Sequence, residues 1–245
     1  RELPLRLSDC DTLHRHEKSG ELNGLFRVQK FAQDDAHIFV TEEQISDEFK
    51  RILEIANLFY SIFDIKFKIR LGTKPDDYMG DDKTWARAEK ELEAILKKNK
   101  FDYFIGQGEG AFYGPKLDIL MQDSLGRQWQ TGTIQLDFQL PRKFDLKYTD
   151  KDGKEKTPAV IHRVIYGSLE RFMGILIEHF AGAFPTWLSP VQVAIIPVSE
   201  KFNRYAEEVK IKLESEDIRV ELHSAAETLG RRIRNAEMQK IPYLL

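Results

Sequence analysis

Hydrophobic residues recur first with a strand-like and then with a helical period in the first part of the chain. Residues 5–16 and 25–40 are predicted to form two strands, joined by a turn-rich link. Thr41 and Gln44 then make the pattern of a capping box, and helical spacing continues to about residue 63. The apolar positions at this helical spacing are Ile45, Phe49, Ile52, Leu53, Ala56 and Phe59.

A second group of shorter elements follows. A strand is predicted over residues 67–71, and then a helix that Asp82 caps. The apolar face of this helix is Trp85, Ala88, Leu92, Ile95 and Leu96. The glycine-rich loop GQGEGAFYGP separates further short strands, at residues 103–106, 116–122 and 128–139. In the last of these strands the apolar residues change from odd to even positions, which predicts a β-bulge near Gly132.

The sequence changes character near residues 188–190. Before this point, a charged hairpin or loop, a strand in AVIHRVIYG and a helix in SLERFMGILIEHF follow one another. After it, strand and helix patterns alternate, which is typical of a parallel α/β unit. We therefore predict an α+β domain over residues 1–188, with a mostly antiparallel sheet flanked by helices. A smaller, truncated α/β domain is predicted over residues 189–245.

Composition narrows the class of protein. At 245 residues and 42% hydrophobic content the chain can bury a sizeable core. Its 37 basic and 40 acidic residues leave a net charge of −3, which argues against a protein that coats nucleic acid by bulk charge. The single cysteine, Cys10, excludes a disulfide framework and favours a cytoplasmic location, and no apolar run is long enough to span a bilayer. Because it starts without a methionine, the chain is predicted to be a piece of a longer protein.

The segment Arg27–His37, RVQKFAQDDAH, carries the most specific polar pattern. Read as a strand, it presents its odd positions on one face. These positions are Arg27, Gln29, Phe31, Gln33, Asp35 and His37. A sheet face lined with successive polar groups is typical of the floor of a small-molecule site, and an exposed edge strand is the alternative.

Two arginines are predicted to converge beside this segment. Arg15 and Glu17 share a face of the preceding strand, and Arg27 lies on its partner strand. Paired guanidinium groups clamp a polyphosphate well, while the carboxylate can accept a hydrogen bond from an exocyclic amine. A surface ladder of arginine and glutamate is the alternative explanation of this spacing.

Two further patterns are ambiguous on spacing alone. His37 and His162 have the chemistry of zinc ligands, but most histidines so far apart in a sequence satisfy a core hydrogen bond or lie on the surface. The run Gly167–Arg171 lies at a predicted strand-to-helix junction, where free N–H groups beside an arginine suit an anion. A helix cap with a solvated arginine is the more ordinary explanation of that run.

Together these motifs resemble one family. An Arg-x-Glu hairpin with a second arginine, followed by Gly-Ser-x-Glu-Arg at the head of an apolar helix, is similar to motifs 2 and 3 of class II aminoacyl-tRNA synthetases. Within that class the chain resembles the threonyl-tRNA synthetase family over essentially its whole length. The segments that carry the resemblance are RELPLRLSDCDTLHRHEKSGELNGLFRVQKFAQDDAHIF, GEGAFYGPKLDI, WQTGTIQLDFQLP, VIHRVIYGSLERF and AFPTWLSPVQV.

The resemblance implies that residues 1–188 are a class II catalytic domain with an ATP site. Arg15 would hold the α-phosphate of ATP and the amino-acid carboxylate, Glu17 the adenine amine, and Arg27 the γ-phosphate. The two faces of the adenine would be covered by Phe31 and Arg171. The implied catalytic residues are Arg15 and Arg171. The implied ATP-binding residues are Arg15, Glu17, Arg27, Phe31, Gln130 and Arg171.

The same resemblance implies a threonine pocket with a zinc ion. Its residues would be Gln33, Asp35, Tyr113, Lys116 and Gln135, with Gln130 also on this side. His37 and His162 would be two of three Zn²⁺ ligands, the third being a cysteine upstream of this chain that Cys10 does not replace. A zinc ion with an open position can bind the amino group and the β-hydroxyl of threonine together, whereas isosteric valine offers only one of these groups. Thr131 stands where a typical family member has cysteine.

The implied activity is a threonine–tRNA ligase that uses ATP with Mg²⁺. The carboxylate of L-threonine attacks the α-phosphate, giving threonyl-adenylate and pyrophosphate, and the acyl group then passes to tRNA(Thr). Residues 189–245 would begin the anticodon-binding domain, in which the basic stretch Arg231–Arg234 contacts RNA phosphates or forms a solvated helix face. The full-length protein is expected to be a homodimer, whose motif 1 lies upstream of this chain.

Two alternatives are open on the sequence alone. The related prolyl enzyme uses the same chemistry, but the presence of both His37 and His162 argues against it, because proline has no hydroxyl for a metal to bind. A catalytically silent synthetase paralogue would bind tRNA or a small ligand without activating an amino acid. Such proteins usually lose the ATP arginines, and here all three are present.

Overall fold

The computed structural model describes residues 3–245, and the chain divides into two compact units, Arg1–Gly174 and Ile175–Leu245. The larger unit is built on a seven-stranded sheet, in which every neighbouring pair is antiparallel except β5 and β6. The strands in spatial order are β1 (Leu5–Asp9), β4 (Asp35–Val40), β11 (Ala159–Val164), β8 (Gln128–Asp137), β7 (Lys116–Gln122), β5 (Phe67–Gly72) and β6 (Tyr103–Gly106). The mostly antiparallel sheet flanked by helices is thus confirmed, while the domain boundary at residues 188 and 189 stays a prediction.

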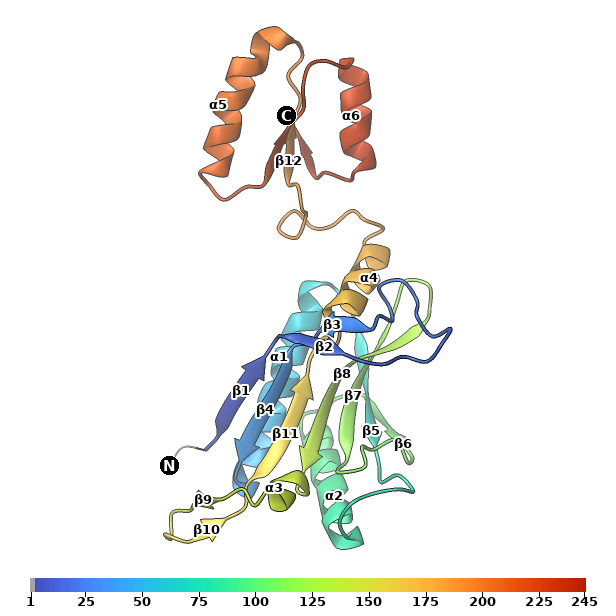
Figure 1. Cartoon of the computed structure of the whole chain (residues 1–245), viewed down its shortest axis with the longest axis vertical. Helices are drawn as coiled ribbons and strands as arrows, with labels where there is room; N and C mark the ends of the chain where they lie inside the picture. Colours follow the sequence, from blue (N-terminus) through green and yellow to red (C-terminus); the bar gives the residue numbers. More distant parts are fainter. Residues whose placement is uncertain (1–2) are drawn as a thin grey trace. The chain divides into compact units, whose positions relative to one another are not determined.

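Two helices, α1 (Ile45–Ile62) and α2 (Asp82–Lys98), cover one face of this sheet (Figure 1). A short 3₁₀ turn, Glu42–Gln44, leads into α1, and the N–H of Thr41 donates to Gln44 Oε1 at 3.0 Å, as the capping-box pattern predicted. The apolar stripe of α1 is buried against the sheet. Packing of such a face supplies most of the stability of a helix in a protein.

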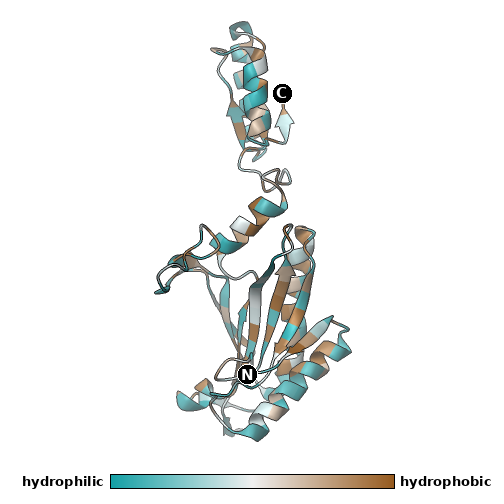
Figure 2. Cartoon of the chain, turned by 90° about the vertical axis from the view of Figure 1, so that its right-hand side faces the viewer, coloured by the Kyte–Doolittle hydropathy of each residue, from teal (hydrophilic) through white to brown (hydrophobic). Residues whose placement is uncertain are grey.

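The opposite face of the sheet is open and polar. Ala36, Ile38 and Val40 of β4 are buried on the helix side, whereas Asp35 and His37 are only half-buried on the other side. Figure 2 shows the same alternation of hydrophobic and hydrophilic residues along the strands. This open face is where a ligand can reach the polar side chains.

The predicted strands over residues 5–16 and 25–40 are each broken in two. β2 (Thr12–His14) and β3 (Lys30–Ala32) form a separate antiparallel pair, and β1 and β4 belong to the large sheet. The second break lies at Asp34, whose carboxylate accepts hydrogen bonds from the N–H groups of Ile165 (2.8 Å) and Tyr166 (3.2 Å). These partners lie far along the chain, so the local alternation pattern could not reveal them.

Two local predictions have different outcomes. A bulge is present where it was predicted: Ile119 pairs with Gly132 and Leu120 with Gln130, so Thr131 is the extra residue. The cap of α2 was predicted at Asp82 and is Asp81, whose carboxylate accepts from the N–H of Thr84 at 2.9 Å.

The remaining elements of the larger unit are short. They are α3 (Leu140–Lys143) and the hairpin of β9 (Tyr148–Thr149) and β10 (Glu155–Lys156). The helix α4 (Leu169–His179) follows β11 in the chain. None of the helices within residues 3–245 combines the length and apolar content that crossing a membrane requires.

The smaller unit has the predicted parallel α/β pattern. Its three-stranded parallel sheet has the order β13 (Val220–Leu222), β12 (Val193–Ile195), β14 (Tyr243–Leu244). Its helices are α5 (Asn203–Glu214) and α6 (Leu229–Met238), and a 3₁₀ turn, Glu200–Phe202, precedes α5. Val193 and Ile195 pack with α5, whereas Ala194 packs with α6. Both faces of β12 are therefore covered, which explains its continuous apolar sequence.

Candidate active site

Four polar residues stand in one row across the open face of the large sheet. His37 of β4 pairs with His162 of β11, His162 with Gln135 of β8, and Gln135 with Lys116 of β7. Paired residues on adjacent strands point to the same face, with Cβ atoms about 5 Å apart. The sheet therefore brings together four of the predicted site residues, although they are widely separated in sequence.

A cavity of about 310 Å³ lies on the same unit, beside the β2–β3 pair and the start of α4. Seven predicted site residues line it: Arg15, Glu17, Arg27, Phe31, Gln33, Gln130 and Arg171. The lining does not include Asp35, His37, Tyr113, Lys116, Gln135 or His162. The residues implied for ATP thus share one cavity, and most of those implied for threonine and zinc lie outside it on the sheet face.

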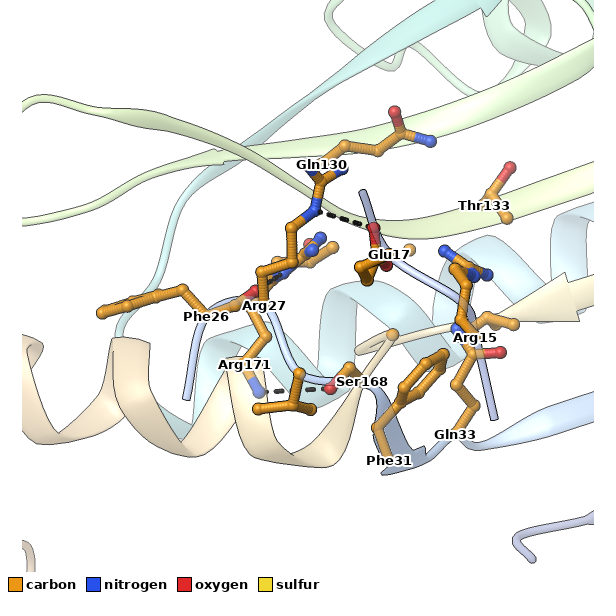
Figure 3. Close-up of a pocket in the computed structure, with 15 residues that line it drawn as sticks. Arg15, Glu17, Phe26, Arg27, Phe31, Gln33, Gln130, Thr133, Ser168 and Arg171 are labelled. Atoms are coloured by element: carbon orange, nitrogen blue, oxygen red, sulfur yellow. Dashed lines mark hydrogen bonds and ion pairs between the residues drawn. The ribbon is translucent and has the colours of Figure 1, made fainter. Parts of the chain in front are cut away.

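Three guanidinium groups surround this cavity, with Glu17 between them (Figure 3). Arg27 Nε lies 3.6 Å from Glu17 Oε2, and its Nη1 lies 3.3 Å from Glu21 Oε2. Arg171 Nε donates to the carbonyl oxygen of Phe26 at 2.8 Å. Burial, and then the positive charges of Arg27 and Arg15, lower the pKa of Arg171. An anionic ligand would relieve this mutual repulsion, so the cavity is suited to a polyphosphate.

Phe31 forms one wall of the cavity beneath Arg15. Its side chain is only 6% exposed, and the guanidinium carbon of Arg15 lies 5.3 Å from the centre of its ring. The arginine therefore occupies one ring face by a cation–π contact. Stacking of an adenine on Phe31 stays a prediction.

On the sheet face, Tyr113 contacts the row of polar residues. Its hydroxyl donates to Gln135 Oε1, and its ring lies 5.2 Å from that of His162. Burial, and then the charges of Asp137 and Asp35, raise the pKa of this hydroxyl to about 12, so it stays a neutral donor at pH 7.

The two histidines fit a metal only in part. Their ring centres are 4.7 Å apart, and burial, followed by the charge of His162, lowers the pKa of His37, which favours the neutral form that binds metals. His162 Nε2 lies 3.0 Å from the buried carboxylate of Asp137, which can only accept, so Nδ1 keeps a free lone pair. Within residues 3–245, no cluster of three His, Cys, Asp or Glu side chains could hold a metal. The pair can therefore supply two ligands of a zinc site.

Sequence reasoning missed several residues of the cavity. Phe26 lines the cavity, and outside the lining it stacks on Trp129 with ring centres 4.9 Å apart, while the guanidinium of Arg127 lies 5.3 Å from both ring centres. Thr133 also lines the cavity. The polar alternation of Thr133 and Gln135 on β8 was a signal for it.

The run Gly167–Arg171 forms the helix cap of the alternative explanation but not its solvated arginine, and its role in binding an anion stays a prediction. The N–H of Arg171 donates to Ser168 Oγ at 3.2 Å, which satisfies one of the free donors at the start of α4. The side chain of Arg171 is half-buried and lines the cavity.

Solved structures that resemble this chain include synthetases. The RNA-binding domain of threonyl-tRNA synthetase from Cryptosporidium parvum Iowa II superimposes with a TM-score of 0.95 at 43% identity, covering 100% of this chain and 62% of that one. The prolyl-tRNA synthetase of Cryptosporidium parvum gives a TM-score of 0.69 at 18% identity over 98% of this chain and 47% of that one, which shows the fold alone.

Sequence comparison gives the same result. The chain is 53% identical to proteins named threonine–tRNA ligase from Caldanaerobacter subterraneus subsp. tengcongensis and from Thermotoga neapolitana, in both cases over all of its 245 residues and 38% of the relative. It thus spans well under half the length of these relatives. Residues 192–245 match a family described as an anticodon binding domain. Residues 1–180 match the tRNA synthetase class II core domain (G, H, P, S and T), and the chain belongs to this family.

Proposed function

We propose that this chain is the catalytic part of a threonine–tRNA ligase. One observation carries the proposal: the seven residues that the family motifs assign mainly to ATP line a single cavity that three guanidinium groups surround. Its 53% identity to proteins named threonine–tRNA ligase supports threonine as the amino acid. Class II synthetases use ATP with Mg²⁺, and the proposed ligase would bind both.

The residues of the chain would act mainly by positioning and charge. Arg15 would hold the α-phosphate and the threonine carboxylate close together, so that the carboxylate oxygen attacks phosphorus and pyrophosphate leaves. Arg27 and Arg171 would stabilise the charge that develops on the phosphate oxygens. Phe31 and Glu17 would contact the adenine. The acyl group of threonyl-adenylate would then pass to the terminal ribose of tRNA(Thr).

The sheet face would read the threonine side chain. Asp35 would accept from the β-hydroxyl, and Tyr113, Lys116 and Gln135 would complete this side together with Gln33, which lines the cavity. His37 and His162 would hold Zn²⁺ together with a ligand from outside this chain. A bound zinc ion would supply coordination to the amino group and the hydroxyl, which valine cannot match.

The other partners follow from the same proposal. The unit that contains the anticodon-binding match would contact tRNA(Thr), and the whole protein would act as a homodimer in the cytoplasm. A silent paralogue that only binds tRNA or a small ligand is disfavoured, because Arg15, Arg27 and Arg171 all reach the cavity.

The test is amino-acid-dependent ATP–pyrophosphate exchange by the natural protein that contains this chain. Exchange with threonine, weaker exchange with serine, none with valine or proline, and loss on zinc chelation are expected. Threonine-dependent exchange that survives chelation would keep the ligase and remove the metal role of the two histidines. Folded, zinc-loaded protein that shows no exchange with any amino acid would refute the proposal.

A further inference from the structure

The open face of β7 carries a fully buried carboxylate, Asp118. It lies two residues from Lys116, so it points to the same face as the row of polar residues. Its neighbours on the adjacent strands are Thr133 of β8 and Arg70 of β5. A buried charge is costly unless several donors satisfy it, so the partners of Asp118 decide what it does there.

Four side chains donate to this carboxylate. Oδ2 accepts from Arg70 (Nη2 at 2.8 Å and Nε at 3.1 Å) and lies 3.1 Å from Lys116 Nζ. Oδ1 accepts from Gln130 Nε2 at 2.7 Å and from Thr133 Oγ1 at 3.1 Å. Arg70 Nη2 also donates to Gln130 Oε1 at 3.2 Å. The carboxylate therefore connects the cavity to the row of residues on the sheet face.

These contacts fix the direction of two hydrogen bonds toward the cavity. A carboxylate only accepts, so the hydroxyl of Thr133 must donate its proton to Asp118 and keeps lone pairs for another group. Gln130 is held at both ends of its amide, by Asp118 at Nε2 and by Arg70 at Oε1, which fixes the orientation of the amide and leaves one N–H of Nε2 and one lone pair of Oε1 spare. Both Thr133 and Gln130 line the cavity.

We propose that Asp118 is a positioning residue that sets the hydrogen-bond polarity of the β8 wall of the cavity. It makes Thr133 an acceptor toward the bound molecule and fixes the Gln130 amide so that its spare Nε2 N–H is available to donate. The matching ligand presents an ammonium or hydroxyl donor to Thr133 and a phosphate or ribose oxygen to Gln130. An aminoacyl-adenylate carries both kinds of group, so this inference rests on the proposed function and deepens it.

The test compares Asp118→Asn with Glu48→Gln in the natural protein that contains this chain. Asn keeps the shape of the side chain, but its amide can donate, so Thr133 and Gln130 are free to reverse. Asp118→Asn is expected to raise the KM for ATP or threonine in exchange by about tenfold or more, with kcat little changed. Glu48 is also a buried carboxylate held by an arginine, Arg6, but it lies outside the cavity. Glu48→Gln is expected to leave both KM values unchanged.

A double-mutant cycle with Thr133→Val separates positioning from general destabilisation. If Asp118 acts through Thr133, the double variant raises KM by less than the product of the two single effects. A purely structural role would instead lower the melting temperature and the active fraction at constant KM, and that result would overturn the inference. If Asp118→Asn does not fold, Thr133→Val decides, because an unchanged KM would exclude the acceptor role.

Failure of the proposed function gives a different result. Absence of exchange in the unmodified protein would refute the ligase, and calorimetric titration with ATP and with threonine would then test the polarity. A weaker affinity for either ligand in Asp118→Asn supports the inference. Equal affinities in the two proteins, or no binding to either, overturn it.

Discussion

Replacing Arg171 by glutamine removes a guanidinium that the fold holds close to two like charges. Its side chain is half-buried, and burial, together with Arg27 and Arg15, lowers its pKa. The substitution loses the hydrogen bond to the carbonyl of Phe26, worth about 1 kcal/mol. It also loses the cation–π contact 5.9 Å from the centre of the Trp129 ring, worth about 0.5 kcal/mol. Relief of repulsion and desolvation offsets these losses, so the free energy of unfolding should change by less than about 1 kcal/mol.

Ligand binding should respond very differently. If Arg171 donates to the phosphates of ATP, its loss costs about 1.5–3 kcal/mol, which is about 10- to 100-fold in the KM for ATP. Urea unfolding of Arg171→Gln and ATP–pyrophosphate exchange measure the two quantities on the same protein.

Arg6→Gln is the matched control because it should give the reverse pattern. Arg6 Nε donates to Glu48 Oε2 at 2.9 Å, and a second contact joins Nη2 to Oε1. Without the arginine, the buried Glu48 loses its charged partner, and this loss destabilises the fold. Because Arg6 itself is partly exposed, the cost should stay at about 1–3 kcal/mol. The KM for ATP should not change. Equal destabilisation by both substitutions, with no change in KM for either, would refute this reasoning.

Three further predictions concern other parts of the larger unit. Tyr60→Phe removes a buried hydroxyl that bonds to Thr131 Oγ1 at 2.6 Å and to a backbone carbonyl after β11 at 2.7 Å, and urea unfolding should show a loss of about 1–2 kcal/mol. Gly132→Ala should prevent folding, seen as loss of soluble protein, because its Cβ would lie 2.3 Å from a carbonyl oxygen, whereas Gly230→Ala meets no atom within 4 Å and should be tolerated. Because the pKa of Tyr113 rises from 10.0 to about 12 on folding, the folded state keeps a proton that the unfolded chain loses. The free energy of unfolding should therefore fall as pH rises from about 10 to 12, and less so in Tyr113→Phe.

The elements that the sequence predicted well are those whose cause is local. The helix after Thr41 and the bulge near Gly132 depend on neighbouring residues, and both are present. The break between β3 and β4 depends instead on Asp34 and on N–H groups about 130 residues away. No alternation pattern contains that information, and the single continuous strand predicted over residues 25–40 was wrong.

The same distinction applies to the candidate site. Spacing alone left Arg15, Arg27 and Arg171 ambiguous, and the resemblance to a known family grouped them; the structure places all three at one cavity. Asp118 was missed because a carboxylate within KLDILMQ is indistinguishable from a solvated one until its strand neighbours are known. Its significance arises from the register of β5, β7 and β8, which only the fold determines.

The distance between the cavity and the histidine pair restricts the ligand. Val164 and Thr133 are paired residues of the cavity lining, and His162 and Gln135 are paired two residues further along the same strands. Two residues of a strand advance about 7 Å. A molecule that places an anion among the arginines and an amine or hydroxyl at the histidines must therefore lie extended across this step. In the proposed reaction, threonine would cross this step with its carboxylate at Arg15 and its amino group and hydroxyl at the histidines, which would bring the carboxylate beside the nucleotide phosphates that Arg27 and Arg171 would hold.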